Sequence, residues 1–474
     1  MMKARRALLP VLMAATTLSG CNLAPAYQRP AMAPLPATFK EMPGWRSAAP
    51  ADAVARGNWW ELLGDPVLSG LEAKVLVSNQ NLAAARAAFE QARALVRQRR
   101  AALFPSVGLN AEGTDAHSFA SGGDKPTSGT GGTSGDAFQL SLGASWEPDL
   151  WGALGNGVSQ AKAQAEASAG DLANATLSAQ GELALDYVQL RGLDEQKRLL
   201  DMTAADYGRA LTITTNRYKA GVAAKSDVDQ AQTALSNAQA QAKDLIRQRA
   251  ALEHAIAVLA GENPSTFSLP EAQWNPMVPE VPAVLPSQLL ERRPDIAAAE
   301  RRVAAANANI GIQRAAGFPL IGLTANAGTG ANALADLFQA GTSAWSVGLS
   351  GLLTLLDFGA NRAKVAGARA GWEQTVAQYR QTVLGAFQQT EDQLAAVRVL
   401  CAEGDDRIAA ATAAGHAEAM ARNQYLAGTI GYADVIVAQT TALDARVAQI
   451  QLITDRQVAA ISLIEAVGGR WDRA

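Results

Sequence analysis

Residues 218–233 read YKAGVAAKSDVDQAQT, and residues 425–440 read YLAGTIGYADVIVAQT. The two stretches agree at Tyr, Ala-Gly, Asp-Val and Gln-Thr, and they lie 207 residues apart (425 − 218). Phe104-Pro105 likewise returns as Phe318-Pro319, at an offset of 214 residues (318 − 104). Because chance agreement at one period over such a span is improbable, the sequence predicts two tandem copies of one structural unit.

The placement of proline predicts long helices, because a proline in a helix interior costs about 3 kcal/mol and usually ends the helix. Between Pro148 and Pro264 lie 115 residues without proline (264 − 148 − 1), rich in the helix formers Ala, Gln, Arg, Leu and Glu. We expect one helix over about residues 155–219, which at 1.5 Å per residue is about 98 Å long. Shorter helices over about residues 67–103 and 222–260 are expected to stack end to end beside it.

The helix predicted over residues 222–260 carries a heptad seam with one polar break, at Arg249. The members of the seam recur at alternating intervals of three and four: Leu235, Ala238, Ala242, Leu245, Arg249, Leu252, Ile256 and Leu259. The rest of this face holds alanine where a globular core would use Leu or Phe. Small seam residues indicate helices that pack closely, as sheets of helices around a wide space.

The segments between the helices switch to a period of two, which is typical of strands. Apolar residues alternate with Gly, Ser, Asn, Gln and Glu over four segments, which begin near Val107, Phe138, Ile321 and Trp345. These patterns predict two β-hairpins, over residues 105–147 and 320–355, whose strands are apolar on one face.

A half-polar strand could equally cover an ordinary protein core, and most such strands do. Here the small polar residues of one face, with Trp146 and Trp345 near strand ends, favour a transmembrane barrel with a wet lumen. Four strands cannot close a barrel in lipid, because open edges leave backbone groups unpaired. Three chains with twelve strands form the smallest assembly expected to leave a channel.

The N-terminus has the pattern of a secretory signal, with Lys3, Arg5 and Arg6 before an apolar stretch that ends at Leu18. The residues Leu18-Ser19-Gly20-Cys21 resemble the bacterial lipoprotein box, in which cleavage precedes an acylated cysteine. We therefore expect removal of residues 1–20 and lipidation of Cys21. The alternative is an ordinary signal peptide with a chance cysteine. In the enteric sorting pattern, an asparagine such as Asn22 after the cysteine favours the outer membrane.

Composition argues against several other classes of protein. The net charge of −3 gives no reason to expect a nucleic-acid partner, and no run of 18 apolar residues follows the signal. The three histidines share no metal-ligand spacing, and the chain has no Gly-Lys pair for a Walker loop. Cys401 is interpreted as a small apolar packing residue. We expect no enzyme activity, cofactor or metal.

A stretch in the second half resembles the hallmark segment of the TolC-like outer membrane efflux proteins, and most of all their lipoprotein branch with OprM-type and NodT-type members. It runs Arg292-Arg293-Pro294-Asp295-Ile296 and continues through Glu300, Asn309 and Ile310-Gly311 to Phe318-Pro319. Further similarity to this family lies nearer the N-terminus, in Trp59-Trp60, Asp65-Pro66 and Gln80-Asn81-Leu82. The likeness covers nearly the whole mature chain.

This resemblance implies a homotrimer with a 12-stranded barrel in the outer membrane and a 12-helix barrel in the periplasm. It implies a periplasmic adaptor protein and an inner-membrane pump as partners, with small molecules as cargo. Similar ducts serve drugs, metal ions and solvents, so the exported substrate stays open. The expected organisation is a signal peptide (1–20), a lipid-anchored N-terminal segment in an equatorial belt (21–66), a first repeat (67–263), a Pro-rich linker (264–286), a second repeat (287–469) and a tail (470–474).

The resemblance also implies a periplasmic gate at the two turns between helices. The gate candidates are Asp227 and Asp434 with the nearby Tyr218 and Tyr425. Three-fold symmetry would repeat each aspartate around the axis, where like charges attract cations. The alternative for the first turn is that Ser226 and Asp227 cap the helix that follows.

The same turns are similar to the segments with which family members contact the adaptor. The candidates for that contact are Gly221, Val222, Ser226, Gly428 and Thr429. For the two glycines the simpler interpretation is a left-handed C-cap, which leaves adaptor contact open. The residues Ile430-Gly431-Tyr432 depart from the usual pattern of this turn.

Two other functions fit part of the sequence. A periplasmic adaptor lipoprotein also has a long helical hairpin behind a lipoprotein box, but it carries one hairpin with small β domains. A structural coiled-coil lipoprotein would not account for the four strands. The duplicated hairpins and amphipathic strands favour an outer-membrane exit channel.

Overall fold

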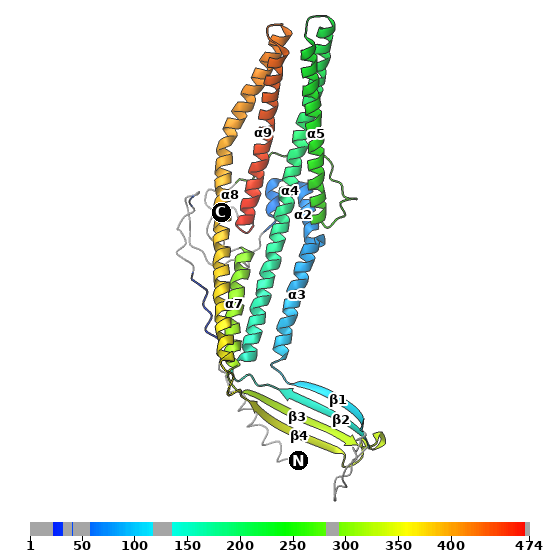
Figure 1. Ribbon diagram of the computed structural model, residues 1–474, viewed down its shortest axis with the longest axis vertical. Helices are drawn as coiled ribbons and strands as arrows, with labels where there is room; N and C mark the ends of the chain where they lie inside the picture. Colours follow the sequence, from blue (N-terminus) through cyan, green and yellow to red (C-terminus); the bar gives the residue numbers. More distant parts are fainter. Residues whose placement is uncertain (1–21, 32–39, 41–56, 117–134, 281–292, 470–474) are drawn as a thin grey trace, which may run out of the picture. The chain divides into compact units, whose positions relative to one another are not determined.

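The protein is described by a computed structural model over residues 22–31, 40, 57–116, 135–280 and 293–469. Its helices and strands are η1 (Trp59–Leu63), α2 (Pro66–Ser78), α3 (Gln80–Ala101), β1 (Ser106–Ala116), β2 (Gly135–Trp146), α4 (Ala153–Lys219), α5 (Lys225–Leu259), α7 (Pro294–Ala315), β3 (Leu320–Ala331), η2 (Leu334–Asp336), β4 (Ser343–Leu352), α8 (Ala360–Leu426) and α9 (Tyr432–Ala466) (Figure 1). The predicted fold class, mainly helical with two β-hairpins, is confirmed. The predicted signal peptide, Cys21 and residues 470–474 lie outside the described residues.

Contacts divide the chain into two compact units. The strand unit contains all four strands with residues 90–101, 153–167, 300–315 and 360–378 of the helices next to them, together with residues 22–30. The hairpin unit contains the remaining described residues, including all of α5 and α9. Within the described residues, no helix combines the length and hydropathy needed to cross a membrane.

The long helices occur in two matched sets. Helices α4 and α8 are each 67 residues long and begin 207 residues apart (360 − 153), and α5 and α9 are each 35 residues long with the same offset (432 − 225). Helices α3 and α7 are each 22 residues long and begin 214 residues apart (294 − 80). These offsets equal those of the repeated sequence motifs, so every residue of one set has a defined counterpart in the other.

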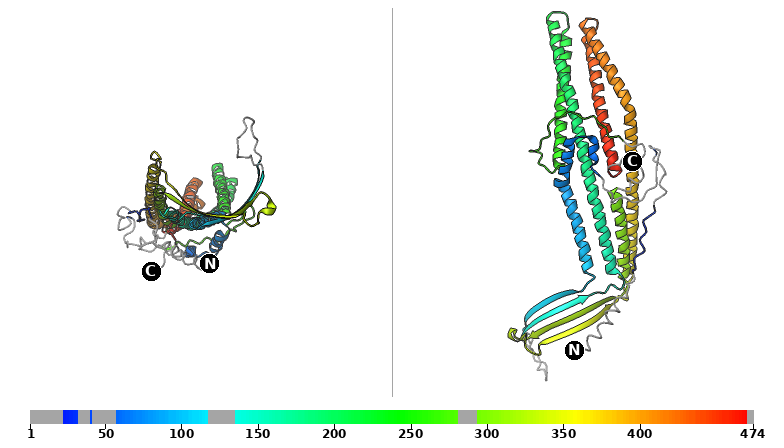
Figure 2. Two further views of the ribbon diagram at one scale, coloured as in Figure 1. Left: turned by 90° about the horizontal axis from the view of Figure 1, so that it is seen from below. Right: turned by 180° about the vertical axis from the view of Figure 1, so that it is seen from behind.

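The four strands form one antiparallel sheet in the order β1-β2-β3-β4, and the sheet is curved (Figures 1 and 2). Directly paired residues share a face of the sheet. One row across the strands is apolar, with Leu109 opposite Leu142, Leu142 opposite Ala327 and Ala327 opposite Trp345. In the part of the chain that the structure describes, β1 and β4 each pair on one side only.

The helix predicted over residues 67–103 is wrong as a single element, because it breaks between α2 and α3. Asn79 takes an extended conformation at the break, with ψ of 122°. Its side-chain oxygen accepts from the amide of Leu82 at 3.0 Å, and its Nδ2 donates to the carbonyl of Leu259 at 2.8 Å. Asn79 therefore caps α3 and also ties it to the end of α5.

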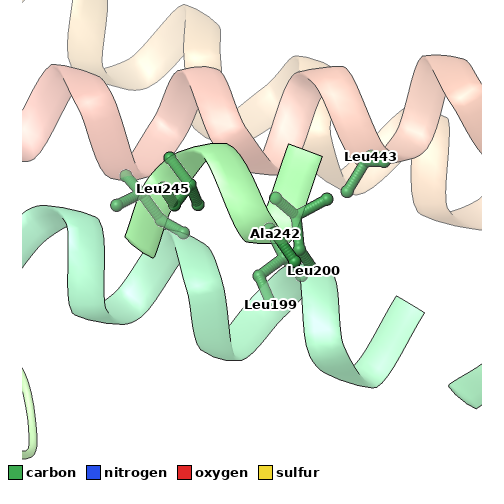
Figure 3. Close-up of a cluster of buried hydrophobic side chains, with 6 residues drawn as sticks. Leu199, Leu200, Ala242, Leu245 and Leu443 are labelled. Carbon is green, nitrogen blue, oxygen red and sulfur yellow. The ribbon is translucent and has the colours of Figure 1, made fainter. Parts of the chain in front are cut away.

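The hairpin unit has an aliphatic core in which several helices meet (Figure 3). Leu199 and Leu200 of α4 pack with Ala242 and Leu245 of α5 and with Leu443 of α9. Ala242 and Leu245 belong to the predicted heptad seam, and both are buried. The predicted seam therefore does face neighbouring helices.

The polar residue in that seam, Arg249, belongs to a buried ion-pair network. Its Nε lies 2.6 Å from Asp194, which also receives Arg191 at 2.9 Å, and the side chains of Asp194 and Arg191 are almost fully buried. Arg249 also pairs with Glu253 at 2.9 Å, and Glu253 accepts from the backbone amide of Leu269 at 2.6 Å. The network thus fastens the segment after α5 onto the first helical hairpin.

The hallmark Arg293-Pro294-Asp295 segment also has a structural role in the hairpin unit. The guanidinium of Arg293 is buried, and it donates to Asp295 at 3.0 and 2.7 Å and to the carbonyl of Ala466 at 2.9 Å. Pro294 is the first residue of α7, where its missing N–H costs nothing. The motif therefore joins the start of α7 to the end of α9.

Candidate functional site

The turn between α4 and α5 and the turn between α8 and α9 have the same backbone geometry. Gly221 and Gly428 are both left-handed, with φ of 76° and 77°. The amide of Val222 donates to the carbonyl of Arg217 at 2.9 Å, and the second turn repeats this bond. This is the Schellman motif, in which glycine avoids the steric penalty of a side chain at positive φ. The predicted C-cap role of both glycines is confirmed.

The interpretation of Ser226 and Asp227 as helix caps is wrong. The residue at the N-cap of α5 is Ala224, which makes no side-chain capping bond, and the N-cap of α9 is Gly431. Asp227 lies in the first turn of α5 instead. There its carboxylate interacts favourably with the positive end of the helix dipole without being used as a cap.

The two hairpins contact each other through a cluster at their turns. The rings of Tyr425 and Tyr432 lie 5.1 Å apart, with their planes 59° apart. Arg217, from the last turn of α4, lies 4.6 Å over the Tyr425 ring, and its Nη1 donates to the carbonyl of Tyr425 at 3.0 Å. A cation–π contact of this kind contributes about 0.5–2 kcal/mol, so Arg217 joins the first hairpin to the second.

Two tyrosines near the turns, Tyr432 and Tyr207, are neutral at physiological pH. Burial, with smaller contributions from the nearby Tyr425, Tyr207 and Asp227, raises the pKa of Tyr432 to about 12. Burial also raises the pKa of Tyr207 to about 12, with Glu418 adding to the effect. The side chain of Asp227 therefore acts on Tyr432, across the space between the two hairpins.

The gate candidates are not equivalent in one chain. Tyr425 is 6% exposed, whereas its counterpart Tyr218 is 44% exposed. Asp227 is half-buried, whereas its counterpart Asp434 is exposed. The structure therefore brings Tyr425 and Asp227 together around Tyr432, and it leaves Tyr218 and Asp434 on the surface of the chain.

The candidate residues for adaptor contact share one property, which is exposure at the turns. All five are accessible in the chain: Gly221, Val222, Ser226, Gly428 and Thr429. Val222 is the apolar member of this set. These residues form a surface that a second protein can reach.

Two residues of the cluster, Arg217 and Tyr432, are absent from the sequence-based candidates. Their roles depend on a contact between hairpins that are far apart in sequence, so no local pattern reveals them. One signal was present, since Tyr432 occupies the position of Lys225 in the other copy and belongs to the segment that departs from the usual turn. A departure inside a repeated motif therefore marked a real contact.

The sheet of the strand unit has a second functional feature, a continuous polar face. In one row Asn110 lies opposite Ser141, and Ser141 lies opposite Gly328. Two rows farther along the same face, the hydroxyls of Ser106 and Ser145 lie 2.8 Å apart. The other face carries large apolar side chains in the open, among them Val107, Leu109, Trp345, Val347 and Leu349. Such a sheet has one face for water and one for an apolar surrounding.

Comparison with known proteins gives matches along nearly the whole chain. The profile of the family described as "Outer membrane efflux protein" matches residues 71–262 and 285–469. The outer membrane protein OprJ of Pseudomonas aeruginosa is 30% identical over 464 residues, which cover 97% of this chain and 95% of OprJ. The cation efflux system protein CusC of Escherichia coli is 30% identical over 469 residues, covering 97% of this chain and 98% of CusC.

A solved structure of the outer-membrane channel OprN is also similar, with a TM-score of 0.85 and 27% identity over 95% of this chain and 100% of that one. These matches confirm the predicted family at the level of efflux proteins, and they assign the chain to transport rather than to catalysis. On its sequence, its repeated helices and its amphipathic sheet, the chain belongs to the outer membrane efflux protein family.

Proposed function

We propose that this chain is the outer-membrane exit duct of a tripartite efflux system, through which small molecules pass from an inner-membrane pump and a periplasmic adaptor to the cell exterior. The observation that carries the proposal is the four-stranded sheet, polar on one face and openly apolar on the other. Family membership supports the same function. The duct is passive, and the pump supplies the energy.

Three copies assemble to form the duct. One sheet has two unpaired edges, at β1 and β4. Backbone groups at such edges cannot stay unpaired in lipid, so the sheets of several copies have to join. Two copies would give eight strands and an interior filled by side chains, whereas three give twelve strands and an open lumen. The two repeats of each copy supply four long helices to the periplasmic part.

The turns of the helical hairpins form the periplasmic gate and the adaptor surface. Arg217 and Tyr425 hold the two hairpins of one copy together, and Asp227 lies beside them. Tyr218 and Asp434 face the neighbouring copies. Opening of the gate requires the contacts between the hairpin turns to loosen. The adaptor binds at the exposed turns that contain Val222 and Thr429.

A lipid anchor at Cys21 attaches the chain to the outer membrane. Support comes from the segment that follows, which lies along α7 in the strand unit. The carbonyl of Pro25 accepts from Asn307 at 2.8 Å, and the carbonyl of Leu23 accepts from Arg314 at 3.1 Å. Arg314 is in the last turn of α7, shortly before β3 begins. The described segment that follows the proposed anchor thus contacts the end of the helix that leads into the sheet.

Single-channel recording in planar bilayers tests the duct. The purified full-length protein is expected to produce discrete, ohmic conductance steps. An adaptor lipoprotein or a structural coiled coil would insert without any steps, and that result would exclude the proposal.

Metabolic labelling with a palmitate analogue tests the anchor separately. The wild-type protein is expected to incorporate the label and a Cys21→Ser variant is expected not to. Equal labelling of both would rule out acylation at Cys21, and it would leave the duct proposal unaffected.

A further inference from the structure

One face of α7 is covered by the N-terminal segment of the chain. Asn307 and Arg314 donate to backbone carbonyls of residues 23–25, at 2.8 and 3.1 Å. A Cβ added at Gly311 would lie 2.6 Å from a side-chain atom of the same segment. Positions 307, 311 and 314 recur at intervals of four and three, so they share one face of the helix. This face is therefore occupied within the chain.

The equivalent face of α3 carries three arginines. Helices α3 and α7 are each 22 residues long, and at their offset of 214 the counterparts of positions 307, 311 and 314 are Arg93, Arg97 and Arg100. All three are exposed, so no segment among the described residues covers this face of α3. The covered face of α7 thus has one cation where the open face of α3 has three.

The charges of α3 are not balanced within the helix. Arg93 pairs with Glu90 at 2.8 Å, but both side chains are exposed, and an exposed pair of this kind contributes little. Glu90 is the one carboxylate in a helix with five arginines, at positions 86, 93, 97, 99 and 100. The helix dipole favours cations in the last turn, which accounts for Arg99 and Arg100 but not for Arg97.

The row of arginines ends close to the apolar face of the sheet. A tight turn follows α3, in which the amide of Leu103 donates to the carbonyl of Arg100 at 3.1 Å. Strand β1 then begins at Ser106, and Val107, on its apolar face, is 65% exposed. Only seven residues separate Arg100 from Val107 (107 − 100).

Two aromatic side chains lie at this corner. Phe104 is 70% exposed, and Trp146, at the end of β2, is 38% exposed. The Nε1 of Trp146 donates to the carbonyl of Leu103 at 3.0 Å, which fixes the indole beside the turn that follows α3. Aromatic side chains gather where a membrane meets water, and the headgroups of the lipids lie at the same depth. The arginines therefore follow the aromatic residues in the direction from acyl chains to headgroups.

We propose that Arg97 and Arg100, with Arg93 at the edge of the site, bind the phosphate groups of anionic phospholipids in the periplasmic leaflet of the outer membrane. This inference rests on the proposed duct, whose sheet is in the membrane and whose helices are in the periplasm. The proposed lipid anchor precedes the segment that covers α7, so that face of α7 is on the outer side of the duct. The equivalent face of α3 is on the same side, toward the lipid.

The spacing of the arginines fits one layer of headgroups. Such a layer is about 5–8 Å thick, and Arg97 and Arg100 are about 4.5 Å apart along the helix axis. Each guanidinium can donate two parallel N–H bonds to a phosphate. Anionic phosphatidylglycerol is preferred over zwitterionic phosphatidylcholine, because the choline of the latter offsets the charge of its phosphate. Each arginine near the surface of an anionic membrane contributes about fivefold to this preference.

Competition between two lipids tests the site. The full-length protein in detergent receives equal amounts of dioleoyl phosphatidylglycerol and dioleoyl phosphatidylcholine, and native mass spectrometry counts the lipids that the trimers retain. The wild type is expected to prefer phosphatidylglycerol, and raising the salt concentration should weaken this preference. The double variant Arg97→Gln with Arg100→Gln should lower the preference by at least about fivefold. Replacing the same two residues by lysine should preserve most of it.

The matched control removes the same charge elsewhere. Lys243→Gln with Arg247→Gln changes two exposed cations of α5, in the hairpin unit, and is expected to keep the wild-type preference. Equal retention of the two lipids by the wild type would overturn the inference, and it is the result expected if a segment of a neighbouring copy covers the arginines. An equal loss of preference in the double variant and in the control would overturn it as well.

A second measurement uses trimers in lipid nanodiscs. The wild type is expected to dissociate at a temperature several degrees higher in phosphatidylglycerol than in phosphatidylcholine, and the double variant is expected to dissociate at the same temperature in both. A difference that persists in the double variant would contradict the site. Planar-bilayer conductance of the same wild-type preparation separates the two proposals. Conducting protein without any lipid preference would leave the duct standing, whereas protein that does not conduct would remove the duct and the placement of α3 that depends on it.

Discussion

The two repeats have the same helices at the same offsets, but they are buried to different extents. In the second repeat α7 is largely buried and Tyr425 packs against Tyr432 and Arg217. In the first repeat α3 is almost entirely exposed and Tyr218 lies at the surface. The difference teaches that one chain forms the contacts from its first repeat to its second, and in the proposed trimer the contacts from second to first are made with another copy.

The repeats have also diverged in chemistry at a position that is buried in the first repeat and exposed in the second. The interpretation of Cys401 as a packing residue is therefore wrong. Asp194 of the first repeat joins Arg191 and Arg249 in the network that holds Leu269. At the offset of 207 the second repeat has Cys401, with Arg456 at 3.9 Å from its sulfur. The first repeat thus has an ion-pair network where the segment after α5 is fastened, and the second repeat has a thiol at the position equivalent to Asp194.

Removing the buried carboxylate should have the largest effect. Asp194→Ala leaves two arginines without their partner, and loss of one member of a buried ion pair costs about 3–5 kcal/mol. Cys401→Ala, at the counterpart position, removes an exposed thiol and is expected to change the free energy of unfolding very little. Chemical denaturation in detergent measures both. Equal losses in the free energy of unfolding would mean that Asp194 and Cys401 contribute equally to stability.

The second prediction concerns α2, whose counterpart at the offset of 214 falls almost entirely outside the described residues. Burial raises the pKa of its Glu72 from 4.5 to about 9, and neither carboxyl oxygen has a hydrogen-bond partner in the described structure. The folded state therefore keeps a proton that the unfolded chain loses above pH 4.5. This contribution to stability is complete below pH 4.5 and declines as the pH rises toward 9, by up to about 1.4 kcal/mol per pH unit.

Glu72→Gln keeps the shape and removes the titration. Its unfolding midpoint should change less between pH 5 and pH 8 than that of the wild type, and it should exceed the wild-type value at pH 8. Glu90→Gln, at an exposed ion pair, is the control and should keep the wild-type pH dependence. An identical slope in wild type and Glu72→Gln would refute the buried protonated carboxyl.

The third prediction compares Arg217 with its counterpart Gln424. Arg217→Ala removes both the hydrogen bond to Tyr425 and the contact with its ring, together about 1–2 kcal/mol. The turns should separate more readily, and the mean single-channel conductance should rise a few-fold. Gln424→Ala at the exposed equivalent should have no such effect in isolation. A conductance unchanged by Arg217→Ala would argue against this contact as part of the gate.

The smallest effect is expected at Gly221. Gly221→Ala meets open space, so its cost is the left-handed backbone alone, about 1 kcal/mol. Gly261 has a similar φ of 72°, but a Cβ there would lie 2.2 Å from the carbonyl oxygen of Ser78. Gly261→Ala should therefore destabilise the protein more than Gly221→Ala does. Thermal denaturation of the two variants checks this order, and the reverse order would contradict the described packing at the end of α5.

Much of the secondary structure could be predicted because its signals are local. The alternation that begins near Val107 predicts a strand, and the proline-free stretch after Pro148 predicts the long helix. The break at Asn79 was missed because no Pro or Gly marks it. What determines it is a hydrogen bond to Leu259, 180 residues away.

The candidate site divides in the same way. The left-handed glycines at 221 and 428 could be predicted from the repeated turn sequence, since the need for positive φ is local. Arg217 and Tyr432 could not, because their partners come from the other repeat. The burial of Tyr425 and the exposure of Tyr218 depend on which repeat lies beside each, and the Tyr-x-Ala-Gly motif that the two turns share carries no such information.

The most direct test is an electron cryo-microscopy reconstruction of the full-length protein in lipid nanodiscs, calculated without imposed symmetry. We predict three copies whose sheets merge into one closed ring, with β4 of each copy hydrogen-bonded to β1 of the next around a hydrated lumen. A single copy in the lipid, or a ring in which the edges of β1 and β4 stay unpaired, would contradict the account.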